Sequence, residues 1–453
     1  MFDSKKNIIE KNVNNCMDIM LDAERWIWAH PQTGFNEWDA DRYLTEKFTE
    51  LGYTLTKAEN IPGFYTDVDT GKAGPTLCIL GELDALDIDT HPEAKDGVVH
   101  ACGHNAQAAT LLGIAAALKM PGTLNGMSGK IRLMAVPAEE TIQLPYREEL
   151  RQKGIIQYFS GKTEFMRRGF FDDVDIALLV HANTNDDEIE FKAYYGSNGI
   201  LSKTIKYKGI ATHAGGAPHL GVNAGYAAAL GLQACNNLRE TFKDEDHIRF
   251  HPVSRGSTNA VNVIPDEVFI ESFLRGKSNE VIAYENKKIN RALAGSALAM
   301  GAQVEIKDRH GCSDEIHDPS YMKLVEKCCN ELVGKEKVEF DYNLWVTASS
   351  DFGDITAVMP GMQFNAAGAS GVCHSVNYFF TQPDRFCGNS AKVQLLIAHA
   401  LLENGAKEAK NIIANYKPAY KSIKEYIAAV ESVTRDIDGV RYSKDGEIFI
   451  NLS

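Results

Sequence analysis

The sequence predicts an α/β fold, in which a mostly parallel mixed sheet is flanked by helices and an α+β domain is inserted into it. Residues 76–86, 131–136 and 176–180 are nearly continuous apolar runs, the pattern of strands covered on both faces. Helical patterns at residues 36–52 and 106–118 lie before and after the first run. Strands that alternate with helices favour a parallel sheet with helices on both sides.

The individual elements follow from local patterns. In residues 36–52, apolar side chains recur every three or four positions, and Gly52 stands where a glycine commonly ends a helix. Residues 106–118 form a helical pattern rich in small side chains. Residues 321–332 are also helical, and from about residue 411 we expect a helix followed by a hairpin around Asp445.

The pattern changes near residue 195. From there the order is strand, helix, strand, strand, helix, strand, at residues 201–208, 223–242, 247–252, 266–274, 280–300 and 302–307. This order is the split βαβ or ferredoxin-like arrangement, a four-stranded sheet with two helices on one face. We therefore expect an inserted domain at 195–312 and a first domain made of 1–194 and 313–453.

Composition and charge narrow the possible functions. The chain has 453 residues, of which 44% are hydrophobic and 24% are charged, so it suits two globular domains rather than a disordered chain. Its net charge of −14 opposes binding to nucleic acids and to anionic membranes. No apolar run approaches the ~18 residues of a membrane-spanning helix. The nine cysteines are an odd number spread along the chain, so we expect a protein of the reducing cytoplasm.

Candidate ligands gather after the first apolar strand. Asp84 falls just beyond it, and Cys102 and His104 stand two residues apart before the helix at 106–118. Ligands of open α/β sheets lie beyond the carboxyl ends of the strands. Gly103 permits a tight backbone path that points a thiolate and an imidazole at one ion. Alone, such a pair is more often a buried cysteine beside a structural histidine.

Two adjacent carboxylates, Glu139 and Glu140, follow the second apolar strand. Burying an ionised carboxylate without a partner costs several kcal/mol, so the pair needs a cation or open water. A solvated loop is the alternative interpretation of these two residues. His181 closes the third apolar run, and His374 follows a loop rich in glycine and alanine. A single histidine at either place is usually structural.

The joint occurrence of these residues favours a metal centre. Five side chains with nitrogen, sulfur or oxygen donors are expected near the strand ends of one sheet: Cys102, His104, Glu140, His181 and His374. Such a set suits one or two divalent ions of intermediate softness, such as Zn²⁺, Mn²⁺ or Co²⁺. The carboxylates of Asp84 and Glu139 are expected close to that centre.

With these residues placed, the chain resembles a known family. The motifs that carry the resemblance are W-A-H-P at 28–31, G-F-N-E at 34–37, G-E-L-D-A-L at 81–86, H-A-C-G-H-N at 100–105, V-P-A-E-E at 136–140, F-D-D-V-D-I-A-L-L-V-H at 171–181, T-H-A-G-G-A-P-H at 212–219 and H-S at 374–375. Their order resembles that of the M20 metallopeptidase superfamily. More narrowly, they are similar to its M20D amidohydrolase branch of hippurate, N-acyl-amino-acid, auxin-conjugate and aminobenzoyl-glutamate hydrolases.

The resemblance implies a metal-dependent hydrolase with a catalytic domain and an inserted dimerisation or lid domain. Carried over position by position, the metal ligands are Cys102, His104, Glu140, His181 and His374. Glu139 matches the general base, which takes a proton from metal-activated water and passes it to the leaving nitrogen. Asp84 matches an aspartate that steadies one of the ligands.

Three residues of the inserted domain match positions that act on the substrate. His213 matches a histidine that stabilises the oxyanion when the lid closes, in its own protomer or in a neighbouring one. Asn262 and Arg275 match polar groups that hold a substrate carboxylate. Without the resemblance, His213 is a histidine of a surface loop, and Arg275 caps a sheet edge in water.

The chain departs from the M20D pattern at several positions. Glu82 and Asn105 replace the usual aspartates of D-x-D-A-L and C-G-H-D, and residues 349–354 read S-S-D-F-G-D. These forms are similar to those of the B-type polypeptides of aminobenzoyl-glutamate hydrolases. An insert at 141–163 replaces the glycine-rich stretch that usually follows E-E.

We therefore expect a cytoplasmic homodimer that cleaves the amide bond of N-acyl amino acids or similar conjugates with one or two Zn²⁺, Mn²⁺ or Co²⁺ ions. Its expected partner is a small N-acyl amino acid or dipeptide-like substrate, with no nucleic acid and no membrane. Three alternatives stay open. They are an M20 dipeptidase or carboxypeptidase, a thiol hydrolase with Cys102 as its nucleophile, and a catalytically silent binding protein of the same fold.

Overall fold

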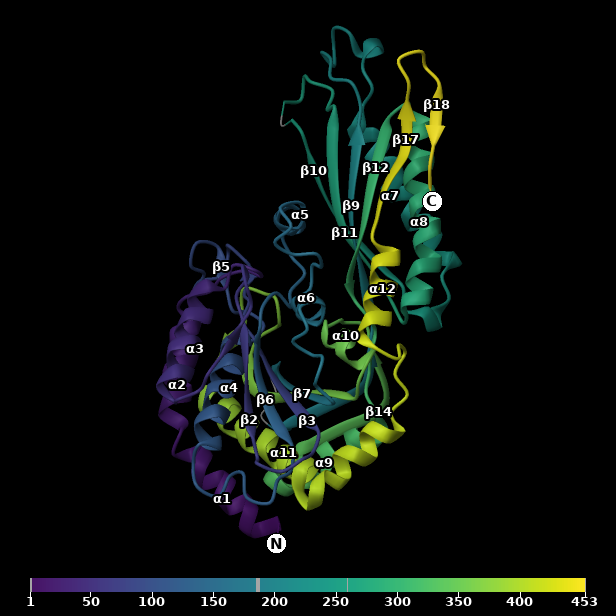
Figure 1. The fold of residues 1–453 in the computed structure, drawn as a ribbon. Helices are drawn as coiled ribbons and strands as arrows, with labels where there is room; N and C mark the ends of the chain where they lie inside the picture. The colour runs from purple at the N-terminus through teal and green to yellow at the C-terminus, as the bar shows by residue number, and fades with distance from the viewer. Residues whose placement is uncertain (1, 185–187, 259, 453) are drawn as a thin grey trace. The chain divides into compact units, whose positions relative to one another are not determined.

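Two compact units make up the chain in the structure, a computed structural model that describes residues 2–184, 188–258 and 260–452. The first unit contains the chain up to Gly196, Glu315–Trp345 and Asp351–Ile423, and the second contains Ser197–Asp314, Val346–Ser350 and the chain from Lys424. Each unit has its own sheet and its own hydrophobic core (Figure 1).

The sheet of the first unit is mixed and has a parallel centre. Among the described residues its ten strands are β1 (Thr56–Lys57), β2 (Phe64–Asp69), β3 (Thr76–Glu82), β6 (Lys130–Val136), β7 (Ile176–Thr184), β8 (Phe191–Ser197), β13 (Glu315–Ile316), β14 (Val338–Val346), β15 (Gly361–Ser370) and β16 (Phe379–Phe380). The main path runs β1-β2-β6-β3-β7-β15-β8-β13. Strands β6, β3, β7 and β15 are parallel neighbours, whereas β2 is antiparallel to β6 and β8 to β15. The predicted mostly parallel mixed sheet is confirmed.

Helices cover this sheet. They are α1 (Phe2–Asn14), α2 (Met17–Trp28), α3 (Trp38–Glu50), α4 (His104–Leu118), α5 (Leu144–Gln152), α6 (Gly161–Arg167), α9 (Pro319–Val333), α10 (Phe352–Thr356) and α11 (Pro383–Asn415). Helix α4 packs against β3, β6 and β7 and also contacts α2 and α11, and all of its residues are buried. Its small side chains permit this packing, since a side chain at Gly113 would collide with Met20. Among the described residues, no helix is long and apolar enough to cross a membrane.

Two further strands of the first unit, β4 (Leu86–Asp87) and β5 (Val98–Val99), form a separate antiparallel pair. The pair lies between β3 and α4 in the chain, so it belongs to the connection that carries Cys102 toward the sheet edge. Short 3₁₀ turns complete the described chain at η1 (Pro218–Leu220), η2 (Leu238–Thr241), η3 (Asp244–Asp246) and η4 (Lys335–Lys337).

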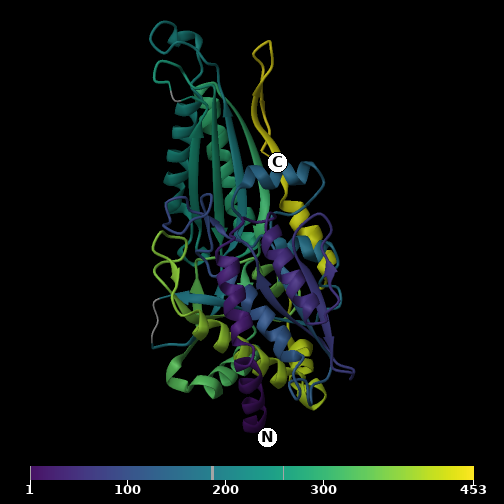
Figure 2. The same cartoon turned by 90° about the vertical axis from the view of Figure 1, so that its left-hand side faces the viewer.

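The sheet of the second unit is antiparallel. Its order among the described residues is β10 (Arg249–Gly256), β11 (Glu267–Gly276), β9 (Gly199–Lys208), β12 (Gln303–Cys312), β17 (Arg435–Tyr442) and β18 (Ile448–Ile450). Helices α7 (Ala224–Asn237) and α8 (Asn279–Met300) pack on each other and on β9 and β11 (Figure 2). Buried residues alternate with more exposed ones along β11, so one face of the sheet is covered. The elements from β9 to β12 form the predicted ferredoxin-like arrangement.

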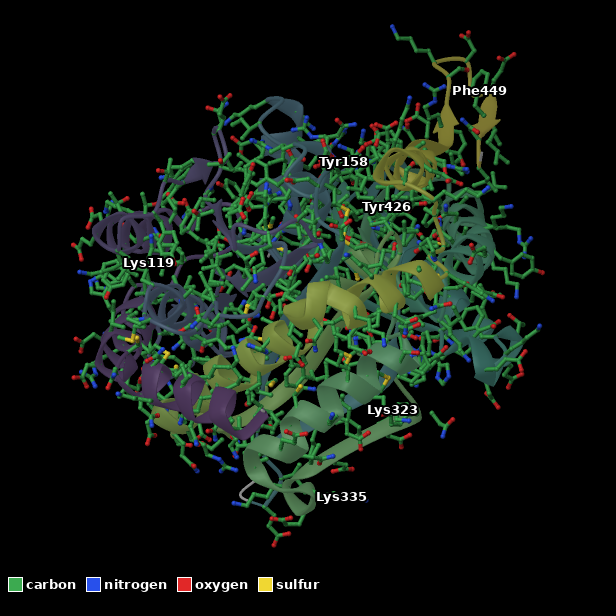
Figure 3. The ribbon with its side chains drawn as sticks, turned by 60° about the horizontal axis from the view of Figure 1, so that its bottom comes forward. Lys119, Tyr158, Lys323, Lys335, Tyr426 and Phe449 are labelled. Atoms are coloured by element: carbon green, nitrogen blue, oxygen red, sulfur yellow. The ribbon has the colours of Figure 1, made fainter. Side chains whose placement is uncertain are left out.

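The C-terminal segment belongs to the second unit, and not to the first as predicted. Strand β17 pairs antiparallel with β12 and extends the sheet at the edge opposite β10. Ile437 and Val440 are buried in the core of the second unit. Helix α12 (Ile423–Val433) places the hydroxyl of Tyr426, labelled in Figure 3, 2.9 Å from Nε2 of His310. The assignment of 424–453 to the first domain is wrong, because β17 satisfies the open backbone edge of β12.

We predict that Ile437→Ala destabilises the second unit. Ile437 is 2% exposed, so truncation leaves a cavity, and we expect a loss of about 2–5 kcal/mol in the free energy of unfolding. Chemical denaturation, with hydrogen exchange of the β12 amides to localise the effect, measures this loss. The matched control is Ile450→Ala on β18, which is 55% exposed and should change stability by less than ~0.5 kcal/mol. Equal losses in the two variants would contradict the packing of β17 described above.

Candidate metal centre

The candidate ligands gather at the carboxyl ends of the parallel strands of the first unit. Asp84 lies two residues beyond β3, and Glu139 and Glu140 lie on the loop after β6. His374 lies on the loop after β15. His181 lies inside β7, three residues before its end, and does not close the strand as expected. Because parallel strands present their carboxyl ends at one edge of a sheet, these side chains meet there.

Cys102 and His104 reach this edge by a sharp turn. Gly103, between them, has φ +90°, a left-handed conformation that glycine adopts without strain. A Cβ at this position would lie 2.7 Å from the side chains of Ala182 and Tyr378. His104 is the first residue of α4, whereas the sequence predicted it on the loop before the helix. The glycine thus allows both donors to turn toward the same place.

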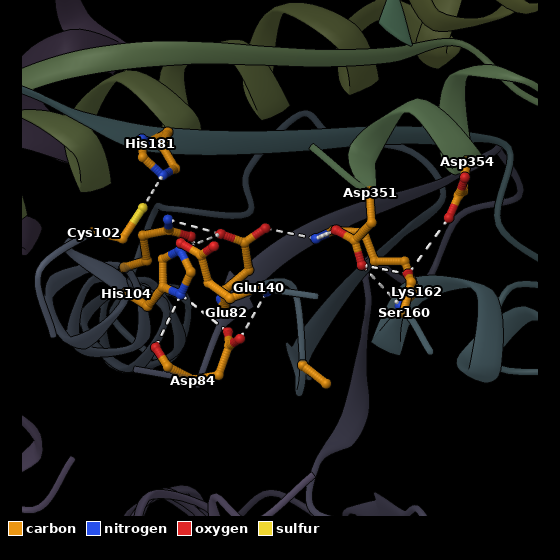
Figure 4. A network of polar contacts seen from close by, with 12 residues as sticks. Glu82, Asp84, Cys102, His104, Glu140, Ser160, Lys162, His181, Asp351 and Asp354 are labelled. Carbon is orange, nitrogen blue, oxygen red and sulfur yellow. Dashed lines mark hydrogen bonds and ion pairs between the residues drawn. The ribbon is translucent and has the colours of Figure 1, made fainter. Parts of the chain in front are cut away.

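The ligand atoms form two groups that share Cys102. Cys102, His104 and His181 each offer one atom within 4.8 Å of the other two. Cys102, Glu140 and His374 do the same. Sγ of Cys102 lies 3.2 Å from Nε2 of His181, as Figure 4 shows, and Oε1 of Glu140 lies 2.9 Å from Nε2 of His374. The structure therefore brings the five predicted ligands together, and two ions could share the sulfur atom.

Asp84 orients two of these ligands. Its Oδ1 lies 3.0 Å from Nδ1 of His104, and its Oδ2 accepts a hydrogen bond of 2.8 Å from the backbone N–H of Glu140. The backbone oxygen of Asp84 is also 3.0 Å from Nδ1, so this nitrogen faces two acceptors and carries the proton. Burial raises the pKa of Asp84, but the bonds from His104 and Glu140 outweigh burial and lower the pKa to about 2.

The other ring nitrogen of His104 remains available to an ion. Nε2 is buried and makes no hydrogen bond among the residues described, although Oε2 of Glu82 lies 3.3 Å away. A histidine that ligates a metal typically donates its second N–H to a carboxylate or a backbone oxygen, as Nδ1 does here toward Asp84. The arrangement therefore presents Nε2 as the metal-binding nitrogen.

Glu139 lies beside the ligands and belongs to neither group around Cys102. It shares a third group with His104 and Glu140, whose donor atoms also lie within 4.8 Å of one another. Burial, followed by the charges of Glu140 and Glu82, raises the pKa of Glu139 well above its ordinary value. A carboxylate with a raised pKa accepts a proton readily, which suits a general base.

The backbone of the loop that carries Glu139 and Glu140 is held in place. Ala138 has φ +58°, a conformation uncommon for residues other than glycine. Its N–H donates a hydrogen bond of 2.7 Å to the buried carboxylate of Glu37. The buried guanidinium of Arg147 donates to the backbone oxygens of Ala138 and Glu140. These bonds hold a strained residue and so fix the direction of the two carboxylates.

The charges of the cluster favour a bound cation over a reactive thiolate. Burial lowers the pKa of His104, but the surrounding carboxylates, Glu82 above all, raise it well above its ordinary value. Burial and the charge of Glu140 raise the pKa of Cys102, and burial lowers that of His181. A protonated thiol beside a neutral imidazole is not activated as a nucleophile. A divalent ion would stabilise the thiolate instead, and the sulfur, nitrogen and oxygen donors suit Zn²⁺, Mn²⁺ or Co²⁺.

His213 and Asn262 lie together in the second unit. The N–H of Ala214 donates a hydrogen bond of 2.9 Å to the backbone oxygen of Asn262, and both His213 and Asn262 are exposed. Nδ1 of His213 accepts from the N–H groups of Gly215 and Gly216 at 3.1 and 2.8 Å. Its proton is therefore on Nε2, which is able to donate a hydrogen bond.

Arg275 lies apart from this pair. It stands near the end of β11, eight residues after Glu267, while Asn262 precedes the start of that strand. At about 3.4 Å per residue the strand separates Arg275 from Asn262 by roughly 25 Å or more. The expectation that both residues hold one small carboxylate is therefore not met within a single chain.

Several residues beside the centre had no role assigned from the sequence. They are Glu37, Glu82, Arg147, Lys162 and Asp351. Glu37 and Glu82 stand in the motifs G-F-N-E and G-E-L-D-A-L, which was the available signal. Arg147 and Lys162 lie in the insert at 141–163, where no pattern singled them out.

Comparison with known proteins identifies the family. The model of peptidase family M20/M25/M40 matches residues 78–399, which is most of the chain and includes the five candidate ligands. The chain therefore belongs to this family, and the predicted resemblance is confirmed. Its class is that of the metal-dependent amidohydrolases and peptidases.

Individual relatives place the chain more closely. It is 26% identical over 300 residues to the B-type polypeptide of p-aminobenzoyl-glutamate hydrolase from Escherichia coli (strain K12), and the match covers 63% of this chain and 57% of that protein. It is 27% identical over 372 residues to Xaa-Arg dipeptidase of Homo sapiens, and this match covers 78% of each chain. A dinuclear metal-binding peptidase of the M20 family from Bacillus subtilis shares the fold, with a TM-score of 0.62 and 17% identity over 85% of this chain and 99% of that one.

We predict that Asp84→Ala weakens metal binding about 10- to 100-fold, because Asp84 fixes the orientation of His104 and the backbone of Glu140. Competition with a chromophoric chelator for Zn²⁺ measures the affinity. Asp87→Ala is the matched control, since Asp87 is an exposed carboxylate three residues further on and should leave the affinity unchanged. An affinity of the Asp84 variant equal to that of the control would rule out this orienting role.

Proposed function

We propose that this chain is a metal-dependent amidohydrolase that hydrolyses the amide bond of N-acyl amino acids or similar conjugates, such as aminobenzoyl-glutamate. The observation that carries the proposal is a carboxylate, Glu139, that lies among metal-ligating groups and is needed in neither group around Cys102. Similarity to the B-type polypeptide of p-aminobenzoyl-glutamate hydrolase supports the substrate class.

Amide hydrolysis needs a nucleophile, a proton for the departing amine, and a positive environment for the carbonyl oxygen. A divalent ion held by Cys102, His104, Glu140, His181 and His374 supplies a water of pKa about 7 and polarises the carbonyl. Glu139 takes a proton from this water at its carboxylate and gives it to the leaving nitrogen. The held backbone at Ala138 keeps this carboxylate in place for both transfers.

The second unit completes the proposed site. Nε2 of His213 donates a hydrogen bond to the carbonyl oxygen as negative charge develops on it. Because Asn262 and Arg275 lie far apart on one chain, we propose that two copies contribute them, in a homodimer formed through the inserted domain. The cysteines of the described residues are free, which supports a reducing compartment such as the cytoplasm.

A dipeptidase is the second candidate. The similarity to Xaa-Arg dipeptidase favours it, because that match covers 78% of both chains. The same groups would cleave a peptide bond, and the two candidates differ only in the substrate.

One experiment tests both candidates. Protein purified without chelator is analysed for bound metal and then assayed with p-aminobenzoyl-glutamate, N-acetyl and N-benzoyl amino acids, and Xaa-Arg dipeptides. We expect the highest kcat/KM on an acylated amino acid or conjugate, with loss on chelation and recovery with Mn²⁺, Zn²⁺ or Co²⁺. Highest kcat/KM on the dipeptides would favour the dipeptidase. Loss with a thiol alkylator and indifference to the chelator would favour the thiol hydrolase, and no turnover at all would favour the silent binding protein.

We predict that Glu139→Gln raises the barrier by about 3 kcal/mol or more, a fall in kcat of roughly 100-fold. The amide cannot accept the proton, yet it has nearly the same shape, so the metal content should stay at the wild-type level. Steady-state kinetics with parallel metal analysis measures both quantities. Glu149→Gln, at an exposed glutamate of the insert, is the control and should keep the wild-type rate. A wild-type kcat for the Glu139 variant would show that the base is another group.

We predict that Arg275→Ala raises KM about 10- to 100-fold for substrates with a free carboxylate and much less for their amidated analogues. The lost interaction is a charge-assisted hydrogen bond of roughly 1.5–3 kcal/mol. Kinetics on matched acid and amide substrates measures the difference. Arg255→Ala, at an exposed arginine of β10 paired with Glu271, is the control. Equal changes on both substrates would exclude a carboxylate-binding role.

A further inference from the structure

A buried lysine from the insert reaches the acidic side of the metal centre. Lys162 is fully buried, and its Nζ donates to Oε1 of Glu82 at 2.5 Å and to Oδ1 of Asp351. Figure 4 shows the ammonium group between these two carboxylates. Lys162 is not a metal ligand, and the mechanism above assigns it no step.

The lysine lies within a cluster that has the spacing of a metal site. Glu82, Glu139 and Asp351 each offer a carboxylate oxygen within 4.8 Å of the other two. Oxygens of three carboxylates are the ligands that hard and borderline divalent ions prefer. Ionised carboxylates this close together in a buried place repel one another unless a cation lies among them. The ammonium of Lys162 is that cation.

Glu139 belongs to two such groups. One contains His104 and Glu140, and the other contains Glu82 and Asp351. An ion bound by Glu139 in the second group would occupy the lone pairs that a general base needs. An ammonium group neutralises the cluster differently, because it bonds only through its N–H donors to Glu82 and Asp351.

The fold fixes the position of this ammonium group. Ser160 caps α6, and its Oγ donates to Oδ2 of Asp351 at 2.6 Å, while the backbone N–H of Lys162 donates to the same oxygen at 3.2 Å. A side chain at Gly161 would collide with the backbone oxygen of Pro137, so α6 packs directly on the loop that leads to Glu139.

The lysine also keeps its charge. Burial lowers the pKa of Lys162, but the carboxylates of Asp351 and Glu82 outweigh burial and raise the pKa above its ordinary range. The ammonium form is therefore a permanent part of the site at neutral pH.

We propose that Lys162 is a positioning residue, an internal cation that excludes a divalent ion from the Glu82, Glu139 and Asp351 carboxylates and so leaves Glu139 unligated. The proposal rests on the proposed function, since it takes Glu139 as the general base. It assigns the insert a role at the metal centre. It also predicts a change in metal stoichiometry, which is measured without reference to activity.

The test is the number of ions bound by full-length Lys162→Met. Wild-type and variant proteins are dialysed against the same free Mn²⁺ concentration, and bound metal is measured by mass spectrometry. We expect the variant to bind one ion per chain more than the wild type. Lys162→Met/Asp351→Asn removes one carboxylate together with the lysine and should return to the wild-type number. Lys153→Met, at an exposed lysine of the same insert, should not change it.

Kinetics adds a second readout. As Mn²⁺ is raised beyond the level that activates the wild type, kcat of Lys162→Met should fall while KM stays constant, because the extra ion engages Glu139. A merely structural role would not make kcat depend on metal in this direction.

Each outcome decides the proposal. A folded Lys162→Met protein with the wild-type number of ions overturns it. A variant that folds only with Mn²⁺, as thermal unfolding would show, supports it, because the ion replaces the lost charge. A variant that stays unfolded with and without Mn²⁺ overturns it. A wild-type rate for Glu139→Gln would instead remove the proposed base, whatever the stoichiometry of the lysine variant.

Discussion

Buried negative charge at one edge of the first sheet is the constraint on which the rest of the site depends. Glu82, Asp84 and Asp351 are almost completely buried, and Glu139 and Glu140 lie beside them. Buried carboxylates remain ionised only where cations or N–H donors compensate them. The chain supplies His104 and a backbone N–H to Asp84, His374 to Glu140, and Lys162 to Glu82 and Asp351. The groups around Cys102 are the places where divalent ions complete this compensation.

The backbone prepares the site before any ion or substrate binds. Gly103, Ala138 and His374 have positive φ values, and each of these residues is a ligand or stands next to one of the chemically active groups. Such conformations persist only where surrounding contacts hold them. The bonds from Glu37 and Arg147 do this for the loop at Ala138. Donors fixed in this way need little reorganisation during the reaction.

Much of the first unit and the candidate ligands could be predicted because they depend on local pattern. The strands β3, β6 and β7 read as apolar runs, and Asp84, Glu139 and Glu140 follow two of them directly. The C-terminal strands could not be placed in the same way. Nothing in residues 435–450 says which sheet edge they join, because an open edge accepts any strand of suitable register.

The sequence by itself determined which donor atoms stand near the ends of the strands, because apolar periodicity marks the strands and the residue type sets the donor. Only the tertiary structure decided that Cys102 is shared by two ligand groups and that Lys162 fills a third group of carboxylates. It also decided that Asn262 and Arg275 lie apart. The reason is physical: these relations join segments distant in the chain, and the packing of strands and helices, not local pattern, sets the distances between them.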